Sequence, residues 1–427
     1  MKRGRIIWAL VLLKAAYLGI IAGVLLLWPD MDQGAFSRFI HWPRNGEPEF
    51  ASHFATWDAA HYLYLSEAGY SPGVPSCAFY PLWPVLIRCF SVVTGGNHLF
   101  AGMVLSNVFS LAALGLFYRM VGERLGTSVA KLSLLLLLAF PGSLFFHFGY
   151  TESLFFLLLM IFCDGLERNR YSAVWVAAFL LPLTRAVGVF CIFPLIWHLA
   201  KTAPPAWLTR WKGPATWLSR FGLVAAGSSG LEDSAPSDLI PEAGGGLVPA
   251  RQQPARFPRL GIQPAWVLIL APAVGWICYL LLIWAWTGNA FEGFEAQKYW
   301  GWVQSISNIF NVPKFLLGFL NPSEWHEFTG SLLDRCVFVL LLNCLPVIWR
   351  LDKGWFVWTV VLGVVPAMSG TFTSFTRFAS VVFPIFVALA VVSQGYSRRY
   401  LRAGVVAGFL ILHVILLWRF VNFRWAG

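Results

Sequence analysis

"IIWALVLLKAAYLGIIAGVLLLW", residues 6–28, is the first long apolar run of the sequence, and it directly follows the basic start MKRGR. An apolar run of about 20 residues is long enough for one helix to cross the roughly 30 Å hydrocarbon core of a bilayer. A cleavable signal peptide has a shorter apolar core and a small-residue cleavage site. We therefore expect residues 6–28 to be an uncleaved signal anchor whose N-terminus lies in the cytoplasm.

Apolar runs of this kind recur along all 427 residues, of which 58% are hydrophobic and only 12% are charged. Soluble domains carry about 25% charged residues, and backbone groups in lipid must be satisfied within helices or closed barrels. Because no alternating barrel pattern is present, the sequence predicts an all-α polytopic membrane protein. The expected spans are residues 6–28, 99–119, 129–147, 151–166, 265–286, 333–349, 354–370, 377–394 and 401–420.

A further apolar run, residues 172–200, is interrupted by Pro182, Thr184 and Arg185. An arginine at membrane depth is costly and usually faces a cavity or a partner. We therefore predict two short helices that meet near Arg185 on the non-cytoplasmic side. This gives about eleven crossings, with the C-terminus outside.

The net charge of +11 does not indicate nucleic-acid binding, because the basic residues stand at the ends of apolar runs. Basic residues near the ends of spans are typical of cytoplasmic loops. The expected topology places all of these clusters in the cytoplasm: Lys2, Arg3 and Arg5; Arg119, Arg124 and Lys131; Arg168 and Arg170; Arg350 and Lys353; Arg398, Arg399 and Arg402.

Three regions follow from this pattern. Residues 1–202 form N-terminal transmembrane helices with a long first outer loop (29–98), and residues 263–427 form C-terminal ones. Between them, residues 203–262 are rich in Gly, Ser, Pro and Ala, which is the composition of a disordered cytoplasmic linker. The apolar runs 80–93 and 309–320 are too short to cross, so we expect them at the outer interface.

Polar and aromatic side chains from distant segments emerge on the outer side. A carboxylate, histidines, arginines and aromatic residues that converge on one face are typical of a binding or catalytic site. The outer segments are Trp57, Asp58 and His61 in the first loop; 140–153 with Tyr150 and Glu152; Arg185; 287–302; and 370–378 with Arg377.

Each of these residues also has a structural interpretation. Thr56 or Asp58 could cap a helix, on which Asp58, His61 and Tyr62 would share one face. Glu152 could complement a helix dipole. Arg185 could form an ion pair with Glu152 or bind an anion, and Arg377 could snorkel to the interface or contact a phosphate or sugar.

The motifs themselves resemble the second GPI mannosyltransferase family (PIG-V) and its bacterial relatives. "WDAAHYLYLSEAGY" followed by "FYPLWP" is similar to its first-loop signature, and "PGSLFFHFGYTESLF" to its Gly-Tyr-[Ser/Thr]-Glu element. Further similar elements are "LTRAVG", "GNAFEGFEAQKYWG" and "FTRF" up to Pro384. One departure is Ala186-Val187, where the family often has polar residues.

This resemblance implies a GT-C glycosyltransferase that moves a hexose, typically mannose, from a polyprenyl-phosphate donor with inversion. It places Asp58 at the reaction centre. The candidates for donor phosphate or sugar contacts are His61, Arg185, Arg377, Tyr150, Glu152, Trp57 and Gln297. The implied partners are a lipid-linked donor, a glycan or lipid acceptor and membrane lipids, with the site facing outward from a bacterial cytoplasmic membrane.

Elementary chemistry agrees with these roles. A carboxylate such as Asp58 can remove the acceptor proton, and arginines suit the leaving phosphate. We expect no cofactor and no metal, because no DxD motif is apparent. The alternative is a transporter or flippase for a sugar or lipid-linked sugar, although internal repeats typical of transporters are not evident. A purely structural scaffold does not explain why Asp58, Arg185 and Arg377 converge.

Overall fold

The computed structural model describes residues 3–27, 34, 36, 47–204, 264–300, 306–370 and 372–427. Within these residues every regular element is a helix, apart from one isolated bridge between Glu324 and Ser331. The all-α fold predicted from the sequence is confirmed. Most of the 203–262 region, from residue 205 onward, lies outside the described residues.

The helices are α1 (Arg3–Leu27), η1 (Phe50–Phe54), α3 (Asp58–Ala68), η2 (Pro75–Ala78), α4 (Leu82–Ser91), α5 (His98–Leu125), α6 (Thr127–Ala139), η3 (Pro141–Phe146), α7 (Glu152–Glu167), α8 (Tyr171–Thr184), η4 (Ala186–Cys191), α9 (Ile192–Thr202), η6 (Pro264–Ile269), α12 (Leu270–Thr287), α13 (Glu292–Glu295), η7 (Ala296–Trp300), η8 (Ile306–Phe310), α14 (Val312–Leu320), α15 (Leu332–Leu351), α16 (Lys353–Thr359), η9 (Val360–Val364), α17 (Val365–Ser369), α18 (Phe375–Ala379), α19 (Pro384–Val392), η10 (Tyr396–Arg398) and α20 (Arg399–Val421).

Five helical segments are long and apolar enough to cross a membrane: Ile6–Leu27, His98–Leu125, Ala265–Thr287, Leu332–Leu351 and Arg399–Val421. The described residues contain five shorter apolar helices as well. This supports a polytopic membrane protein. The expectation of about eleven crossings stays a prediction, because length and composition qualify only five segments in the part of the chain that the structure describes.

Two of the expected spans are not continuous helices. The 129–147 run ends its α-helix at Ala139, and Pro141 then opens the 3₁₀ segment η3. The 377–394 run is divided into α18 and α19, and Pro384 begins α19. Proline lacks the amide that would continue a helix and clashes with the preceding turn, so both breaks have a local cause. The predicted break near Arg185 is confirmed, since α8 ends at Thr184.

Helix α7 occupies the centre of the bundle and is covered by α5 on one side and α8 on another. Thirteen of its residues, Glu152–Phe156, Leu158–Met160 and Phe162–Leu166, are buried. A helix that is apolar on all sides belongs inside a bundle. The position of α7 fixes where its first residue, Glu152, is presented.

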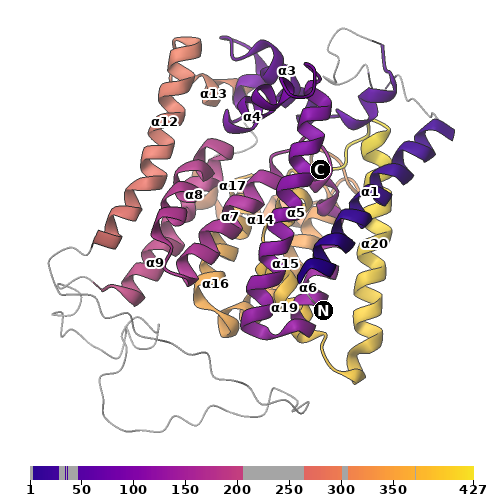
Figure 1. Cartoon of the computed structure of the whole chain (residues 1–427), viewed down its shortest axis with the longest axis vertical. Coiled ribbons are helices and arrows are strands. Elements are labelled where there is room, and N and C mark those ends of the chain that lie inside the picture. Colours follow the sequence, from indigo (N-terminus) through magenta and orange to yellow (C-terminus); the bar gives the residue numbers. More distant parts are fainter. Residues whose placement is uncertain are drawn as a thin grey trace.

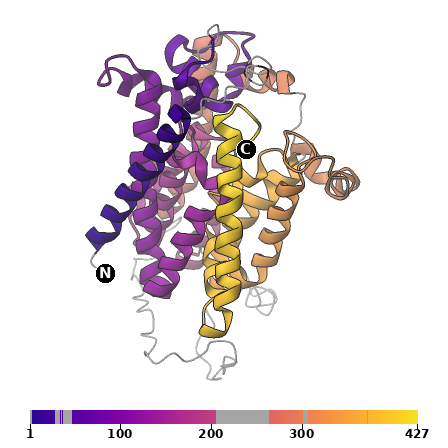
Figure 2. The ribbon, with the colours of Figure 1, turned by 90° about the vertical axis from the view of Figure 1, so that its right-hand side faces the viewer.

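One end of the bundle collects short helices from distant parts of the sequence. Figure 1 shows α3 and α4 beside α13 at this end, and Figure 2 shows from a second side that the C-terminus lies nearer to it than the N-terminus does. The predicted short outer segments correspond to α4 and α14, and no residue of α14 is buried. Residues 54–91 and 292–300 therefore meet at one end, as the sequence predicted.

Candidate active site

The first structural feature of the site is the sharp turn that starts α3. Trp57 occupies the N-cap position with φ 55° and ψ −124°, makes no side-chain cap, and is followed by Asp58 as the first helical residue. A positive φ is strained for a residue with a side chain, and such strain collects at functional sites. Because the Thr56 hydroxyl is also buried without a hydrogen-bond partner among the described residues, neither Thr56 nor Asp58 acts as a helix cap.

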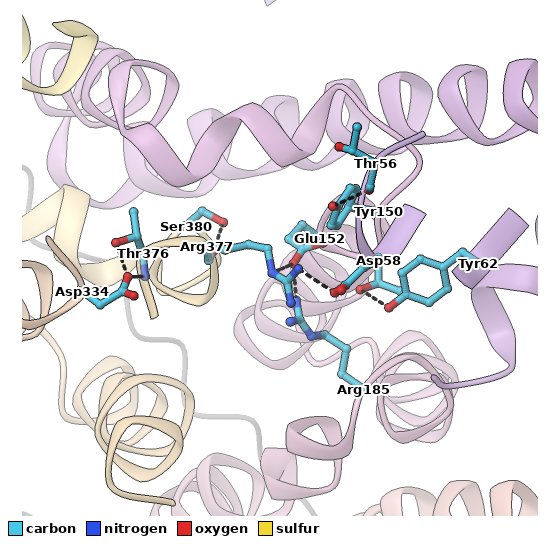
Figure 3. Close-up of polar contacts among 11 residues, drawn as sticks. Thr56, Asp58, Tyr62, Tyr150, Glu152, Arg185, Asp334, Thr376, Arg377 and Ser380 are labelled. Atoms are coloured by element: carbon cyan, nitrogen blue, oxygen red, sulfur yellow. Dashed lines mark hydrogen bonds and ion pairs between the residues drawn. The ribbon is translucent and has the colours of Figure 1, made fainter. Parts of the chain in front are cut away.

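The Asp58 carboxylate instead enters a chain of ion pairs that joins α3, α18, α7 and the residue between α8 and η4 (Figure 3). Arg377 Nη1 lies 2.6 Å from Asp58 Oδ2, and Arg377 Nε lies 3.1 Å from Glu152 Oε1. Arg185 Nη1 donates to the same Glu152 oxygen at 2.8 Å. The chain alternates in sign, with two carboxylates and two guanidinium groups, so its formal charge is zero.

The four side chains of this ionic chain differ in how deeply they are buried. The side chain of Glu152 is 1% exposed and that of Arg377 is 8% exposed, whereas Arg185 and Asp58 are 14% and 18% exposed. Buried charges are tolerated only when they are paired and hydrogen-bonded. Glu152 is thus the inner ion-pair partner of both arginines, and solvent reaches the ionic chain at its Asp58 and Arg185 ends.

Arg377 is held by a short, constrained segment. Helix α18 follows Ser374, which has left-handed backbone angles of φ 60° and ψ 20°. The Asp334 carboxylate accepts hydrogen bonds from the amide of Thr376 at 2.7 Å and from its hydroxyl at 2.5 Å. On the other side Gly142 lies against this backbone: a Cβ at Gly142 would stand 2.2 Å from the Thr376 carbonyl oxygen. These contacts fix where the Arg377 guanidinium projects.

The environment keeps Arg377 charged. The Asp58 and Glu152 carboxylates beside Arg377 compensate for its burial and favour the charged guanidinium. The guanidinium carbon also lies 5.5 Å from the ring centroids of both Phe145 and Tyr150. Aromatic faces stabilise cations at such distances, so the group is a permanent positive charge.

Two tyrosines border the ionic chain. The Tyr150 hydroxyl donates to the carbonyl oxygen of Thr56 at 2.9 Å and so fixes the turn before Asp58. The Tyr62 hydroxyl lies 3.4 Å from Thr151 Oγ1. Burial, followed by the negative charge of Asp58, raises the pKa of both tyrosines, which therefore stay neutral.

The remaining predicted residues lie around this centre. His61 Nδ1 is 2.8 Å from Ser76 Oγ, and the His61 ring stacks on Phe79 with centroids 4.7 Å apart. Trp57 Nε1 donates to the carbonyl oxygen of Arg424 at 3.2 Å. Gln297 lies in η7, which packs against η2. Among the described contacts of the ionic chain, none involves Gln297.

Sequence reasoning missed two parts of the site. Asp334 positions α18, and its place at the start of the 333–349 apolar run was a usable signal, because acids inside membrane segments usually have a role. The C-terminal segment also reaches the site, where Trp425 packs edge-on against Trp57 with centroids 4.9 Å apart. No pattern in the sequence indicates that contact.

In the described part of the chain, no group of three or more His, Cys, Asp or Glu side chains is arranged to hold a metal ion.

Comparison with known proteins adds the family. The sequence profile of the mannosyltransferase (PIG-V) family matches residues 32–203. Over these residues the chain is similar to that family, as its motifs predicted. The match supports a glycosyltransferase that moves mannose, and the apolar helices support an integral membrane protein. No curated protein and no solved structure matches the chain.

The family match covers the N-terminal residues of the site, and the structure adds a residue from the C-terminal region. The matched residues include Asp58, Tyr150, Glu152 and Arg185, but they end long before Arg377. The structure brings Arg377 to Asp58 across 319 positions of sequence. The candidate active site therefore combines the family segment with a residue from the C-terminal region.

Proposed function

We propose that this protein transfers mannose from a polyprenyl-phosphate donor to a hydroxyl of a glycan or lipid acceptor, with inversion at the anomeric carbon. The observation that carries the proposal is the contact of 2.6 Å between Asp58 and Arg377. It joins a carboxylate suited to proton removal to a guanidinium suited to a phosphate. Glu152 extends the same chain to a second guanidinium, that of Arg185.

In the proposed reaction, the Asp58 carboxylate accepts the proton of the acceptor hydroxyl as its oxygen attacks the anomeric carbon. The bond between that carbon and the donor phosphate oxygen breaks, and its electron pair leaves with the polyprenyl phosphate. A single displacement of this kind inverts the anomeric centre. Arg377 and Arg185 stabilise the charge that develops on the phosphate, as positioned donors do in other transferases.

The resting geometry suggests an order of events. Arg377 Nη1 is engaged by Asp58, while its Nε lies beside Glu152. A donor phosphate that takes the place of Asp58 on Nη1 would release that carboxylate to act as a base. Glu152, the most buried member of the chain, would keep both arginines in place during the exchange.

We infer that the site faces outward from the cytoplasmic membrane, as in a bacterial cell. The inference is supported by the opposite end of the bundle, where α5 and α7 end. There Arg119, Arg124 and Arg168 gather, paired with acidic residues such as Asp164. Basic residues at span ends mark the cytoplasmic side. We also propose that transfer needs neither a cofactor nor a metal, since the donor brings its own leaving phosphate.

The direct test is transfer from polyprenyl-phosphate-mannose to acceptors in a membrane fraction, followed by detection of the mannosylated product. Asp58→Asn should lower kcat about 10³-fold or more, as removal of a catalytic base typically does. The matched control is Glu167→Gln, which removes a carboxylate paired at 2.9 Å with Arg124 at the other end of the bundle. That control should keep wild-type transfer.

Two results would contradict the proposal. Folded Asp58→Asn protein with wild-type activity would remove the assigned base. Movement of the sugar or lipid-linked sugar across the membrane without a glycosidic product would favour the transporter alternative. A chelator should leave transfer unchanged, and a loss restored by a divalent cation would overturn the metal-independent mechanism.

A further inference from the structure

A second cationic site lies at the end of the bundle opposite the candidate active site. A cavity of about 450 Å³ opens between the first turns of α6, the turn after α19 and the start of α20. In Figure 1 these three elements meet at the lower end of the bundle, away from α3 and α4. The cavity is lined by Lys131, Arg402, Ser128, Gln394, Leu132 and Leu135.

The charge of this cavity is not balanced. Lys131 and Arg402 form no ion pair with any described residue, and the described residues that line the cavity include no acid. The contrast is with Arg124 at the same end, which binds Glu167 at 2.9 Å and Asp352 at 2.6 Å. The charge of Arg124 is thus compensated by two carboxylates. The cavity instead presents two positive charges to a ligand that must bring its own negative charge.

Neutral donors at the cavity favour the same ligand. The N-cap of α6, Gly126, offers no side-chain cap, and the first turn of α6 contains no acidic residue. The first amides of a helix lack intrahelical acceptors and carry the positive end of the helix dipole. Ser128 and Gln394, whose side chains can donate hydrogen bonds, also line the cavity. Phosphate oxygens are suited to this combination of cations, hydroxyl, amide and helix terminus.

The apolar wall of the cavity favours a lipid over a soluble anion as the ligand. Leu132 and Leu135 lie on one face of α6, one turn apart, and lead from the cations along the helix. The side chain of Leu135 is 47% exposed, so this wall is open to a neighbouring apolar chain. A soluble phosphate would leave this surface unused, whereas an acyl chain would cover it.

We propose that the α6–α19–α20 cavity binds an anionic phospholipid, with its phosphate between Lys131 and Arg402 and an acyl chain along Leu132 and Leu135. Anionic lipids are enriched on the cytoplasmic leaflet and attract basic residues there, which agrees with the position of this cavity away from the proposed outer site. The inference is independent of the proposed transferase activity.

The test uses purified full-length protein in detergent and measures lipids retained in native mass spectrometry, with phosphatidylglycerol and phosphatidylcholine of the same acyl chains. Wild-type protein should retain phosphatidylglycerol preferentially. The double variant Lys131→Gln/Arg402→Gln should bind it about tenfold more weakly, since each basic residue near an anionic head group contributes appreciably. Lys131→Arg/Arg402→Lys, which keeps both charges, should bind as wild type does.

The matched control is Arg170→Gln/Arg350→Gln, which removes the same charge from the same end but not from the cavity. It should keep wild-type lipid preference. Equal binding of both lipids by the wild type, or unchanged binding by the Lys131/Arg402 variant, overturns the proposal. Inorganic phosphate is the second arm: if it competes fully with the lipid at millimolar concentration, the cavity is a free-phosphate site and the lipid assignment is wrong.

Discussion

Replacing Asp58 by asparagine should have two opposite effects: loss of transfer and tighter binding of polyprenyl phosphate. In the resting structure Asp58 occupies Arg377 Nη1, the atom that we assign to the donor phosphate. The wild-type carboxylate therefore competes with the phosphate for one guanidinium. Asparagine is close in shape but carries no charge, so the competition is weakened while the site keeps its form.

The structure sets the size of this effect. Unit charges 2.6 Å apart attract by about 6 kcal/mol at an effective dielectric constant near 20. Most of this is offset by the hydration that the 18% exposed Asp58 carboxylate regains when it is released, and coupling energies for close charge pairs begin at about 1.5 kcal/mol. Glu152 still lies beside Arg377 Nε in the variant. We therefore expect the Kd to fall about tenfold, which corresponds to about 1.4 kcal/mol.

Isothermal titration calorimetry with a short-chain polyprenyl phosphate measures this directly in detergent. Arg377→Gln should weaken binding by about tenfold or more, because it removes a charge-assisted contact, and Glu167→Gln should leave the Kd unchanged. If Asp58→Asn binds the phosphate no more tightly than wild type, Asp58 and the phosphate do not share Arg377. The proposed release of the base would then be refuted even if the variant were inactive.

Two further predictions concern the segment that holds Arg377. Asp334→Asn removes the charged acceptor of the Thr376 amide and hydroxyl. Because such charge-assisted hydrogen bonds contribute about 1.5–3 kcal/mol, kcat should fall about tenfold or more while the protein remains folded. Kinetics at saturating donor measure this, and an unchanged kcat would show that Asp334 does not position Arg377. Gly142→Ala places a methyl group 2.2 Å from the Thr376 carbonyl oxygen, so the midpoint of thermal unfolding should fall and transfer should weaken. The control Gly115→Ala, where a Cβ meets nothing within 4 Å, should lower neither the midpoint nor transfer.

Much of the fold follows from the sequence because lipid restricts the choices. Runs such as residues 6–28 can only be helices in a bilayer, and α1 covers residues 6–27 of this run. The break at Arg185 also follows locally, from Pro182 and a costly charge. The breaks after Ala139 and before Pro384 carry proline signals too, but hydropathy averaged over a window conceals a proline inside an apolar run.

The site could be predicted as a set of residues but not as a set of contacts. Topology placed Asp58, Glu152, Arg185 and Arg377 on one face, and the structure joins them. Which carboxylate pairs with which arginine depends on the packing of α3, α7 and α18, and no local pattern encodes it. The contact between Trp57 and Trp425 is of the same kind, because it depends on how the segment after α20 meets the turn before α3.

The burial of α7 has a consequence for the enzyme in different membranes. A bilayer thicker or thinner than a helix prefers causes the helices that touch lipid to tilt or shift. Those are the outer helices: only 22% of the apolar window of α1 and 22% of that of α20 is buried in the protein. Helix α7 is enclosed by protein along nearly its whole length, so bilayer thickness acts on it only through its neighbours. Glu152 and the two arginines that it anchors should thus keep their spacing, and mannose transfer should vary little between vesicles of short-chain and long-chain lipids.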